Sequence, residues 1–329
     1  MKGFTDIIGH EQIIEHFQNS LRARQISHAY ILNGENGSGK NMLASAFAKA
    51  LVCEAGYGDA CNMCKACRQF DGGNHPDVRR VLHEKKTGIG VDEVREQVCN
   101  DVLIKPYSSK YKIYIVDEAE KMTPQAQNAL LKTIEEPPSY AVIMLLTNSV
   151  EALLPTIRSR CILLNLHSVD TDKIRDFLMQ VHHVPDYQAR VCASYAQGNT
   201  GRALLMATSE NFREMHELML RTVKRVDDMK VSDMAAAVVD ISKYKAQIGD
   251  FLDLMMVWYR DVLVLKATGD LNAVVYKDEY RYLKRKAETS SYEGISRIFE
   301  AMDNARTRIN ANASFEWTIE LLLVMIKEN

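Results

Sequence analysis

The sequence predicts an α/β fold with a parallel sheet, followed by a region built only from helices. Short apolar runs alternate with amphipathic helical segments as far as residue 167, which is the order typical of a parallel sheet covered by helices on both faces. A glycine-rich loop joins the first of these runs to a helix, and beyond His167 no strand pattern recurs. Because 329 residues are too many for one ordinary core, we expect two or three domains.

The composition is that of a globular protein, with 47% apolar and 26% charged residues. A net charge of −2 argues against wholesale coating of nucleic acid and leaves room only for local contacts. No run approaches the roughly 18 uninterrupted apolar residues that a membrane span needs, and residues 1–6 lack the apolar core of a signal peptide. We therefore expect a cytoplasmic protein, whose clustered cysteines are better suited to metal binding than to disulfides.

The elements of the α/β region follow from their hydrophobic patterns. Apolar residues recur at helical spacing over residues 11–24, which predicts an amphipathic helix. Thr123 is a good helix N-cap, Pro124 suits the first helical position, and the proline pair at residues 137–138 ends that helix. The β-rich runs predict strands at residues 28–32, 78–82, 112–116, 141–146 and 162–166, and a further helix is expected over residues 91–103.

Residues 34–41 match the phosphate-binding spacing G-x-x-x-x-G-K and are called the phosphate loop below. Glycines, here Gly34, Gly37 and Gly39, let successive backbone N–H groups point at phosphate oxygens, and Lys40 reaches the outer phosphates. The N-terminus of the following helix adds partial positive charge. Asn41 stands where the motif has Ser or Thr, whose hydroxyl ligates Mg²⁺. We therefore expect the loop to hold a nucleotide better than it hydrolyses one.

The other half of a nucleotide site is expected where two strands end. The predicted strand before Asp117 and Glu118 places two acids where one can hold Mg²⁺ and the other can polarise the attacking water. The next strand ends in Thr147 and Asn148. The carboxyl ends of parallel strands meet at one edge, so these residues are expected beside the phosphate loop. A glycine-rich surface turn is the alternative for the loop alone, and the acidic strand end disfavours it.

Four cysteines cluster in the spacing C-x7-C-x2-C-x2-C, namely Cys53, Cys61, Cys64 and Cys67. Such spacing predicts a tetrahedral zinc site, and four protein sulfurs leave no open position, so the site is structural. The alternative is a set of free thiols, which would be liable to oxidation. His75 and His83 are spare ligands in principle, although the turn-like sequence before Pro76 assigns His75 to a loop.

Helices are expected for the rest of the chain. Residues 172–181 and 187–196 predict helices of a small lid, and the glycines that precede Arg202 begin another helix. From about residue 211 the pattern is helical throughout. The last helix, near residues 315–326, is apolar nearly all round, which indicates packing against other subunits.

These motifs together resemble a known family over nearly the whole chain. The resemblance rests on the phosphate loop, the four cysteines, the acidic strand end, and the strings LLKTIEEPP at residues 130–138, SRC at 159–161, GRA at 201–203 and NAN at 310–312. The chain is similar to the clamp-loader subunits of bacterial DNA polymerase III, which belong to the AAA+ class.

The resemblance implies three domains: an AAA+ nucleotide-binding domain at residues 1–167 with a zinc module inserted at about residues 53–67, a small helical lid at 168–207, and a helical collar domain at 208–329. It also implies a hetero-pentamer with gamma or tau and delta subunits, acting on the sliding clamp and, through the complex, on primed DNA. The residues that it implies for nucleotide binding are Gly34, Gly37, Gly39, Lys40, Asn41, Thr147, Asn148 and Arg202.

Two departures distinguish this chain from the ATP-hydrolysing members of the family. Those members usually carry Ser or Thr at the position of Asn41 and continue beyond the collar, whereas this chain ends at Asn329. Both differences indicate the subunit type that hydrolyses ATP poorly or not at all, and the alternative is a working ATPase. ATP and Mg²⁺ stay possible ligands because Lys40, Asp117 and Glu118 are retained.

By this resemblance, Arg160 occupies the position of the arginine that such a subunit contributes to the ATP site of a neighbouring subunit. An arginine supplied in this way stabilises the charge on the transferred phosphoryl group. The alternative is a surface arginine that pairs with a carboxylate.

Overall fold

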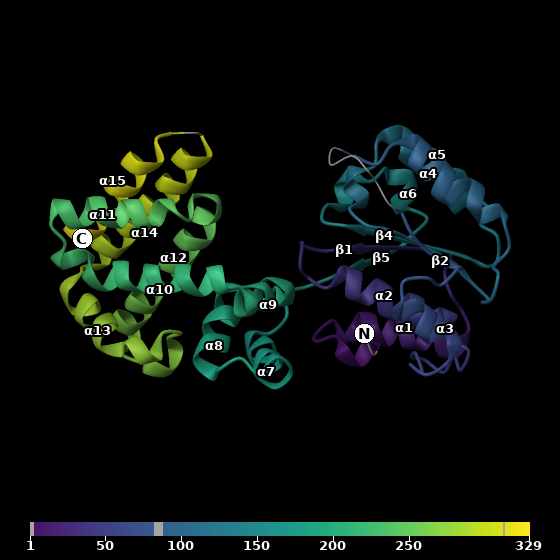
Figure 1. The fold of residues 1–329 in the computed structure, drawn as a ribbon, viewed down its shortest axis with the longest axis horizontal. Coiled ribbons are helices and arrows are strands. Elements are labelled where there is room, and N and C mark those ends of the chain that lie inside the picture. The colour runs from purple at the N-terminus through teal and green to yellow at the C-terminus, as the bar shows by residue number, and fades with distance from the viewer. Residues whose placement is uncertain (1–2, 82–87, 312) are drawn as a thin grey trace. The chain divides into compact units, whose positions relative to one another are not determined.

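The computed structural model describes residues 3–81, 88–311 and 313–329, and the chain forms two compact units (Figure 1). The first comprises Met1–Lys173 together with Gly198–Arg202, and the second comprises Ile174–Gln197 together with Ala203–Asn329. The strands all belong to the first unit, and the described part of the second unit is helical. The predicted fold class, a parallel α/β domain followed by helices, is confirmed.

The first unit is built on a five-stranded sheet in the order β2-β3-β4-β1-β5, with every neighbouring pair parallel. Asn33 at the end of β1 is paired with Thr147 in β4 and Asn165 in β5, so these strands end at a common edge. Of the strand predicted over residues 78–82, the structure forms β2, which ends at Arg80, and Leu82 lies outside the described residues. The strands are β1 (Ala29–Asn33), β2 (Val78–Arg80), β3 (Lys112–Val116), β4 (Ala141–Thr147) and β5 (Ile162–Asn165).

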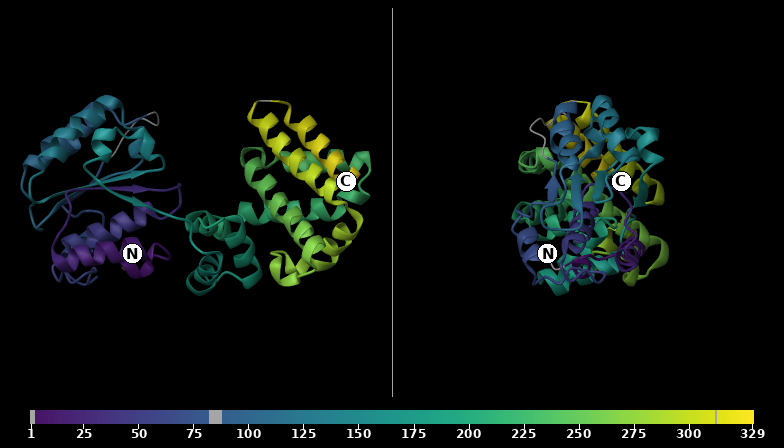
Figure 2. Two further views of the ribbon diagram at one scale, coloured as in Figure 1. Left: turned by 180° about the vertical axis from the view of Figure 1, so that it is seen from behind. Right: turned by 90° about the vertical axis from the view of Figure 1, so that its right-hand side faces the viewer.

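Helices cover both faces of this sheet, with α1, α2 and α3 on one face and α4, α5 and α6 on the other (Figures 1 and 2). Phe17 of α1 and Phe47 of α2 stack at 4.0 Å between ring centroids within the first of the two resulting cores. The helices of this unit are α1 (Glu11–Ala23), α2 (Lys40–Val52), α3 (Lys65–Asp71), α4 (Val91–Val94), α5 (Pro124–Glu135) and α6 (Pro155–Arg158).

Two of the predicted helices show how far the local sequence determines helix geometry. The Thr123 side chain accepts the Ala126 N–H at 3.2 Å, and Pro124 opens α5 as expected from its fixed φ. The helix predicted over residues 91–103 is α-helical only as α4, after which the chain forms a π-helical turn at Arg95–Asn100 and a 3₁₀ turn at Asp101–Leu103.

In the second unit, the long α12 is largely buried and packs against α8, α10, α13 and α14. The last helix, α15, packs on α11 and α14, so much of its apolar surface is already covered, although Trp317 is 74% exposed. No described helix is both long and apolar enough to cross a membrane. The remaining helices are α7 (Thr171–His182), α8 (Asp186–Tyr195), α9 (Thr200–Thr208), α10 (Glu210–Arg225), α11 (Val231–Ser242), α12 (Ile248–Thr268), α13 (Tyr280–Thr289), α14 (Tyr292–Asn310) and α15 (Phe315–Glu328).

His216 of α10 is a half-buried histidine of the second unit, and its Nε2 is shielded from solvent. Its ring lies between those of Phe212 and Tyr276, with centroid distances of 6.4 and 5.7 Å. Its Nε2 has no hydrogen-bond partner among the described residues. Burial and, to a smaller extent, the charge of Lys224 lower the pKa of His216 to about 4. An unfolded histidine binds a proton below about pH 6.5, so between these values protonation favours the unfolded chain.

We expect the free energy of unfolding of the second unit to fall as the pH drops from about 6.5 towards 4, with His216 contributing about 2 kcal/mol by pH 5. His216→Phe keeps the stacking and should remove that contribution. Urea unfolding followed by tryptophan fluorescence is the measurement, because Trp258 and Trp317 both lie in this unit. The exposed His183 supplies the control, His183→Asn. An unchanged pH dependence in His216→Phe would assign the effect to other groups.

Candidate nucleotide and metal sites

The phosphate loop has the backbone that its glycines predict. Gly34 follows β1, and Gly37 and Gly39 have φ values of 85° and 102°, a region that only glycine enters without strain. Gly39 is the N-cap of α2, so the loop leads directly into the start of a helix. This arrangement places free N–H groups of the first helical turn at the loop, as anion binding requires.

Lys40 is folded over the phosphate loop and is only 8% exposed. Its Nζ donates to the carbonyl oxygens of Gly34 and Glu35 at 2.5 and 2.9 Å. Burial lowers the pKa of the Lys40 amine, against the opposing influence of Glu120, Asp117 and Glu35. The lysine is therefore held at the loop, where it can meet phosphate oxygens.

Asn41 connects Asp117 to an arginine that the sequence does not predict as part of the site. The Asn41 Nδ2 donates to Asp117 Oδ2 at 2.8 Å, and Asn41 Oδ1 accepts from Arg80 Nη1 at 2.7 Å. Arg80 Nη2 donates to Ser45 Oγ at 2.6 Å. The structure thus brings Lys40, Asn41 and Asp117 together and adds Arg80. The only signal in the sequence is its place within a predicted strand.

The other acids and polar residues of this edge have partners of their own. Glu118 has a left-handed backbone with φ of 49° and pairs with Lys121 at 2.8 Å. The buried Thr147 hydroxyl donates to the Ser149 carbonyl at 3.0 Å, and the Asn148 N–H donates to Glu120 at 3.4 Å. Thr147 and Asn148 therefore lie at the predicted edge, and the Thr147 carbonyl accepts the N–H of Gly34, the first residue of the phosphate loop, at 3.0 Å.

The segment Gly198–Arg202, called the glycine turn below, packs against the phosphate loop within the first unit. Asn199 Nδ2 donates to the Asn36 carbonyl at 2.7 Å, and the Gly201 N–H donates to the Gly37 carbonyl at 2.9 Å. A Cβ at Gly201 would lie 2.6 Å from that carbonyl oxygen, so the position requires glycine. The Arg202 N–H donates to Asn199 Oδ1 at 3.0 Å, which places the predicted Arg202 next to the loop.

His10, which is not among the predicted site residues, holds the other side of the phosphate loop. Its Nε2 lies 2.9 Å from the Ser38 carbonyl oxygen, and burial lowers its pKa. A cavity of about 340 Å³ beside it is lined by residues 9–13, 165, 167–170 and 173. The cavity has room for part of a small molecule.

Arg160 lies on the surface of the first unit, between α6 and β5. Its side chain is 39% exposed and pairs with Glu135 at 3.1 Å. The guanidinium also donates to the Thr156 carbonyl and to Ser159 Oγ, at 3.0 and 3.2 Å. None of these partners belongs to the phosphate loop. A surface pair of this kind is worth at most about 1 kcal/mol, so a stronger anionic partner could displace Glu135.

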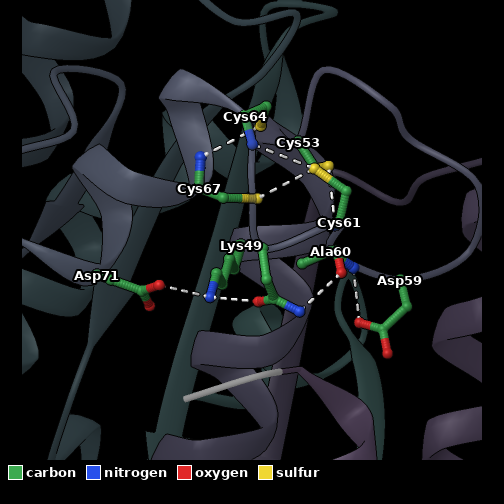
Figure 3. Close-up of polar contacts among 9 residues, drawn as sticks. Lys49, Cys53, Asp59, Ala60, Cys61, Cys64, Cys67 and Asp71 are labelled. Carbon is green, nitrogen blue, oxygen red and sulfur yellow. Dashed lines mark hydrogen bonds and ion pairs between the residues drawn. The ribbon is translucent and has the colours of Figure 1, made fainter.

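The four-cysteine cluster, Cys53, Cys61, Cys64 and Cys67, comes together as the spacing predicts (Figure 3). All four sulfurs lie within 4.8 Å of one another. Sulfurs at 2.3 Å from one tetrahedral ion are about 3.8 Å apart, so the cluster fits one metal ion. Backbone N–H groups of Cys61, Cys64 and Cys67 donate to the sulfurs of Cys53, Cys61 and Cys64, respectively, at 3.2–3.4 Å.

These hydrogen bonds stabilise a thiolate where metal binding requires one. The N–H groups of Met63 and Cys64 lower the pKa of Cys61 to about 6, whereas burial raises the pKa of Cys67. His75 is not part of the cluster, since its Nδ1 accepts the Asp77 N–H at 3.2 Å. His83 lies outside the described residues.

A buried lysine supports the cluster from α2, and its role is not predicted from the sequence. Lys49 Nζ donates to Asn62 Oδ1 at 2.7 Å and pairs with Asp71 at 2.8 Å (Figure 3). Asn62 has a left-handed backbone with φ of 63°, and its amide donates to the Ala60 carbonyl at 3.1 Å. The turn that carries Cys61 and Cys64 is thereby tied to α2 and α3.

Comparison with known proteins identifies a matching family and several similar proteins. The family described as "DNA polymerase III, delta subunit" matches residues 9–170. Over 324 residues the chain is 27% identical to DNA polymerase III subunit delta' of Bacillus subtilis, covering 96% of each protein. It is 29% identical to the tau subunit of the same bacterium over 83% of this chain and 52% of tau. A solved gamma subunit-related protein from Thermotoga maritima covers 96% of this chain and 98% of that one, with 18% identity and a TM-score of 0.43.

The phosphate loop after β1, the acidic end of β3 and the parallel sheet define a P-loop nucleotide-binding domain. With the matches to delta' and tau, the particular family follows. The chain belongs to the clamp-loader subunits of DNA polymerase III.

Proposed function

We propose that this chain is a delta'-type subunit of the clamp loader, helping to load the sliding clamp on primed DNA. In this proposal it assembles with gamma or tau and delta subunits into a hetero-pentamer through a collar at residues 208–329, and residues 168–207 form the lid. The four-cysteine cluster holds structural zinc. The chain retains nucleotide binding through Lys40 and the phosphate loop, hydrolyses ATP poorly or not at all, and presents Arg160 to a neighbour's ATP.

The observation that carries this proposal is the hydrogen bonding of the Asn41 side chain. A hydrolysing P-loop needs a small hydroxyl at this position to ligate Mg²⁺. Asn41 is longer, and both ends of its amide are already hydrogen-bonded, to Asp117 and Arg80. The match to Bacillus subtilis delta' along 96% of each protein supports the same subunit type.

A second candidate is an ATP-hydrolysing subunit of the gamma or tau type. It is favoured by the retention of Lys40, Asp117 and Glu118, and by the 29% identity to tau over the matched region. The two candidates differ in one measurable property, which is ATP turnover by the chain alone.

We expect the purified chain to release phosphate from ATP at least about 100-fold more slowly than a working clamp-loader ATPase, because metal assistance to phosphoryl transfer is worth several kcal/mol. Asn41→Ser should leave nucleotide affinity intact. Lys40→Ala serves as the control, since any turnover that survives it comes from a contaminating enzyme. Rapid turnover that Lys40→Ala abolishes would favour the gamma or tau candidate.

A further inference from the structure

Magnesium does not fit the residues that would have to hold it. Mg²⁺ demands oxygen ligands at about 2.0–2.1 Å in near-ideal octahedral positions. Asn41 Oδ1 is instead bonded to a guanidinium N–H of Arg80, and Asp117 Oδ2 is bonded to the amide N–H of Asn41. A dication at this position would have to displace Arg80, which carries charge of the same sign.

Arg80 is held in place by more than one contact. Its strand β2 pairs with β3, and Asp117 follows β3, so Arg80 and Asp117 end neighbouring strands. Besides Asn41, the guanidinium bonds to Ser45 Oγ, and the Ser45 hydroxyl in turn donates to the Asn41 carbonyl at 2.5 Å. Because a guanidinium stays protonated at any physiological pH, this is a permanent positive charge beside the start of α2.

Two enclosed hydroxyl groups indicate that the phosphate loop has a polar ligand. Ser38 Oγ in the loop and Thr200 Oγ1 in the glycine turn are both shielded from solvent and have no hydrogen-bond partner among the described residues. The glycine turn is itself bonded to the loop at Asn36 and Gly37. Enclosed polar atoms nearly always have a partner in folded proteins, so these two groups are suited to a ligand that accepts hydrogen bonds.

We propose that the phosphate loop binds a nucleoside diphosphate or triphosphate without Mg²⁺, and that Arg80 supplies the positive charge that the metal ion would otherwise provide. Lys40 and the backbone N–H groups of the loop supply the remaining charge and donors. The inference rests on the nucleotide binding in the proposed function, and it is independent of the subunit type and of Arg160. It also accounts for Asn41, whose amide can bridge Asp117 and Arg80 where a Ser hydroxyl is too short to do so.

Equilibrium titration of the full chain with fluorescent ADP and ATP analogues, in buffers containing MgCl₂ or excess EDTA, tests the proposal. The affinities in the two buffers should agree within about twofold, whereas a metal-dependent site would lose about tenfold or more in EDTA. The probes are read by their own fluorescence, so the measurement does not depend on turnover.

Variants of the adjacent residues Arg79 and Arg80 separate the effect of the Arg80 charge from the effects of nearby side chains. Arg80→Gln keeps an amide that can bond to Asn41 and removes the charge, so affinity in EDTA should fall about tenfold. Arg79→Gln is the matched control, because Arg79 pairs with Asp101 at 3.3 Å and should not affect nucleotide affinity. The double variant Asn41→Thr with Arg80→Gln should regain dependence on Mg²⁺.

Three results would overturn the inference: tenfold tighter binding in Mg²⁺ by the unmodified chain, equal affinities for Arg80→Gln and the unmodified chain, or no binding in either buffer. The proposed subunit role would survive each of them if the chain still assembled with gamma and delta subunits. Failure to assemble would instead remove that role and leave the comparison between MgCl₂ and EDTA unaffected.

Discussion

Arg160→Ala is expected to slow ATP hydrolysis at the neighbouring subunit's site by about 10³-fold or more in a reconstituted clamp loader, since arginines supplied in trans are worth about 10³–10⁵ in rate. Clamp loading on primed DNA should fall with it, and assembly should not. The physical reason is that the guanidinium has only weak surface ties, to Glu135 at 3.1 Å and to Thr156 and Ser159. It can therefore turn to an incoming phosphate at little energetic cost.

DNA-stimulated phosphate release and clamp loading are the measurements, with size-exclusion chromatography as the test of assembly. Arg158→Ala, at the end of α6, is the matched control and should have a smaller effect. Arg160→Lys keeps the charge and loses the planar pair of donors, so it should rescue only part of the activity. An assembled Arg160→Ala loader with undiminished turnover would mean that Arg160 is only a surface charge.

Cys67→Ser is expected to remove a stoichiometric zinc ion and to unfold the segment around the four-cysteine cluster. Cys67 is fully buried at the start of α3, and its sulfur lies 4.0 Å from that of Cys61. Structural zinc sites contribute folding free energy directly, about 10–16 kcal/mol of apparent binding energy in short zinc-finger peptides. Within a larger domain we expect a smaller loss, confined to residues near the cluster, because the sheet has a separate core.

Elemental analysis of freshly purified protein should give about one zinc per chain, and proteolysis should cut Cys67→Ser, but not the unmodified chain, near residues 53–71. Cys99→Ser is the control, because Cys99 belongs to the same unit and its sulfur instead donates to the Ala129 carbonyl at 3.5 Å. Unmodified protein without metal would end the zinc assignment. Iron in place of zinc would keep the site and change its metal, since four thiolates suit both.

The features that depend on neighbouring residues could be predicted from the sequence. The phosphate loop is specified by glycines whose left-handed φ values only that residue tolerates, and by a lysine one position later. The cysteine spacing brings the four sulfurs together because one turn and one short helix carry three of them. Thr123 and Pro124 start α5 through contacts within a single turn. In each case the geometry is fixed by a few consecutive residues.

Tertiary structure alone decided which side chains complete these sites. Arg80 meets Asn41 across 39 residues, His10 meets Ser38 across 28, and Asn199 meets Asn36 across 163. Lys49 reaches Asp71 because α2 and α3 pack side by side. Local periodicity can place Arg80 in a strand, but the order β2-β3-β4-β1-β5 determines which residues stand beside it. Strand order follows from packing of the whole sheet. The presence of Arg80 at the expected Mg²⁺ position could therefore not be predicted from the loop sequence.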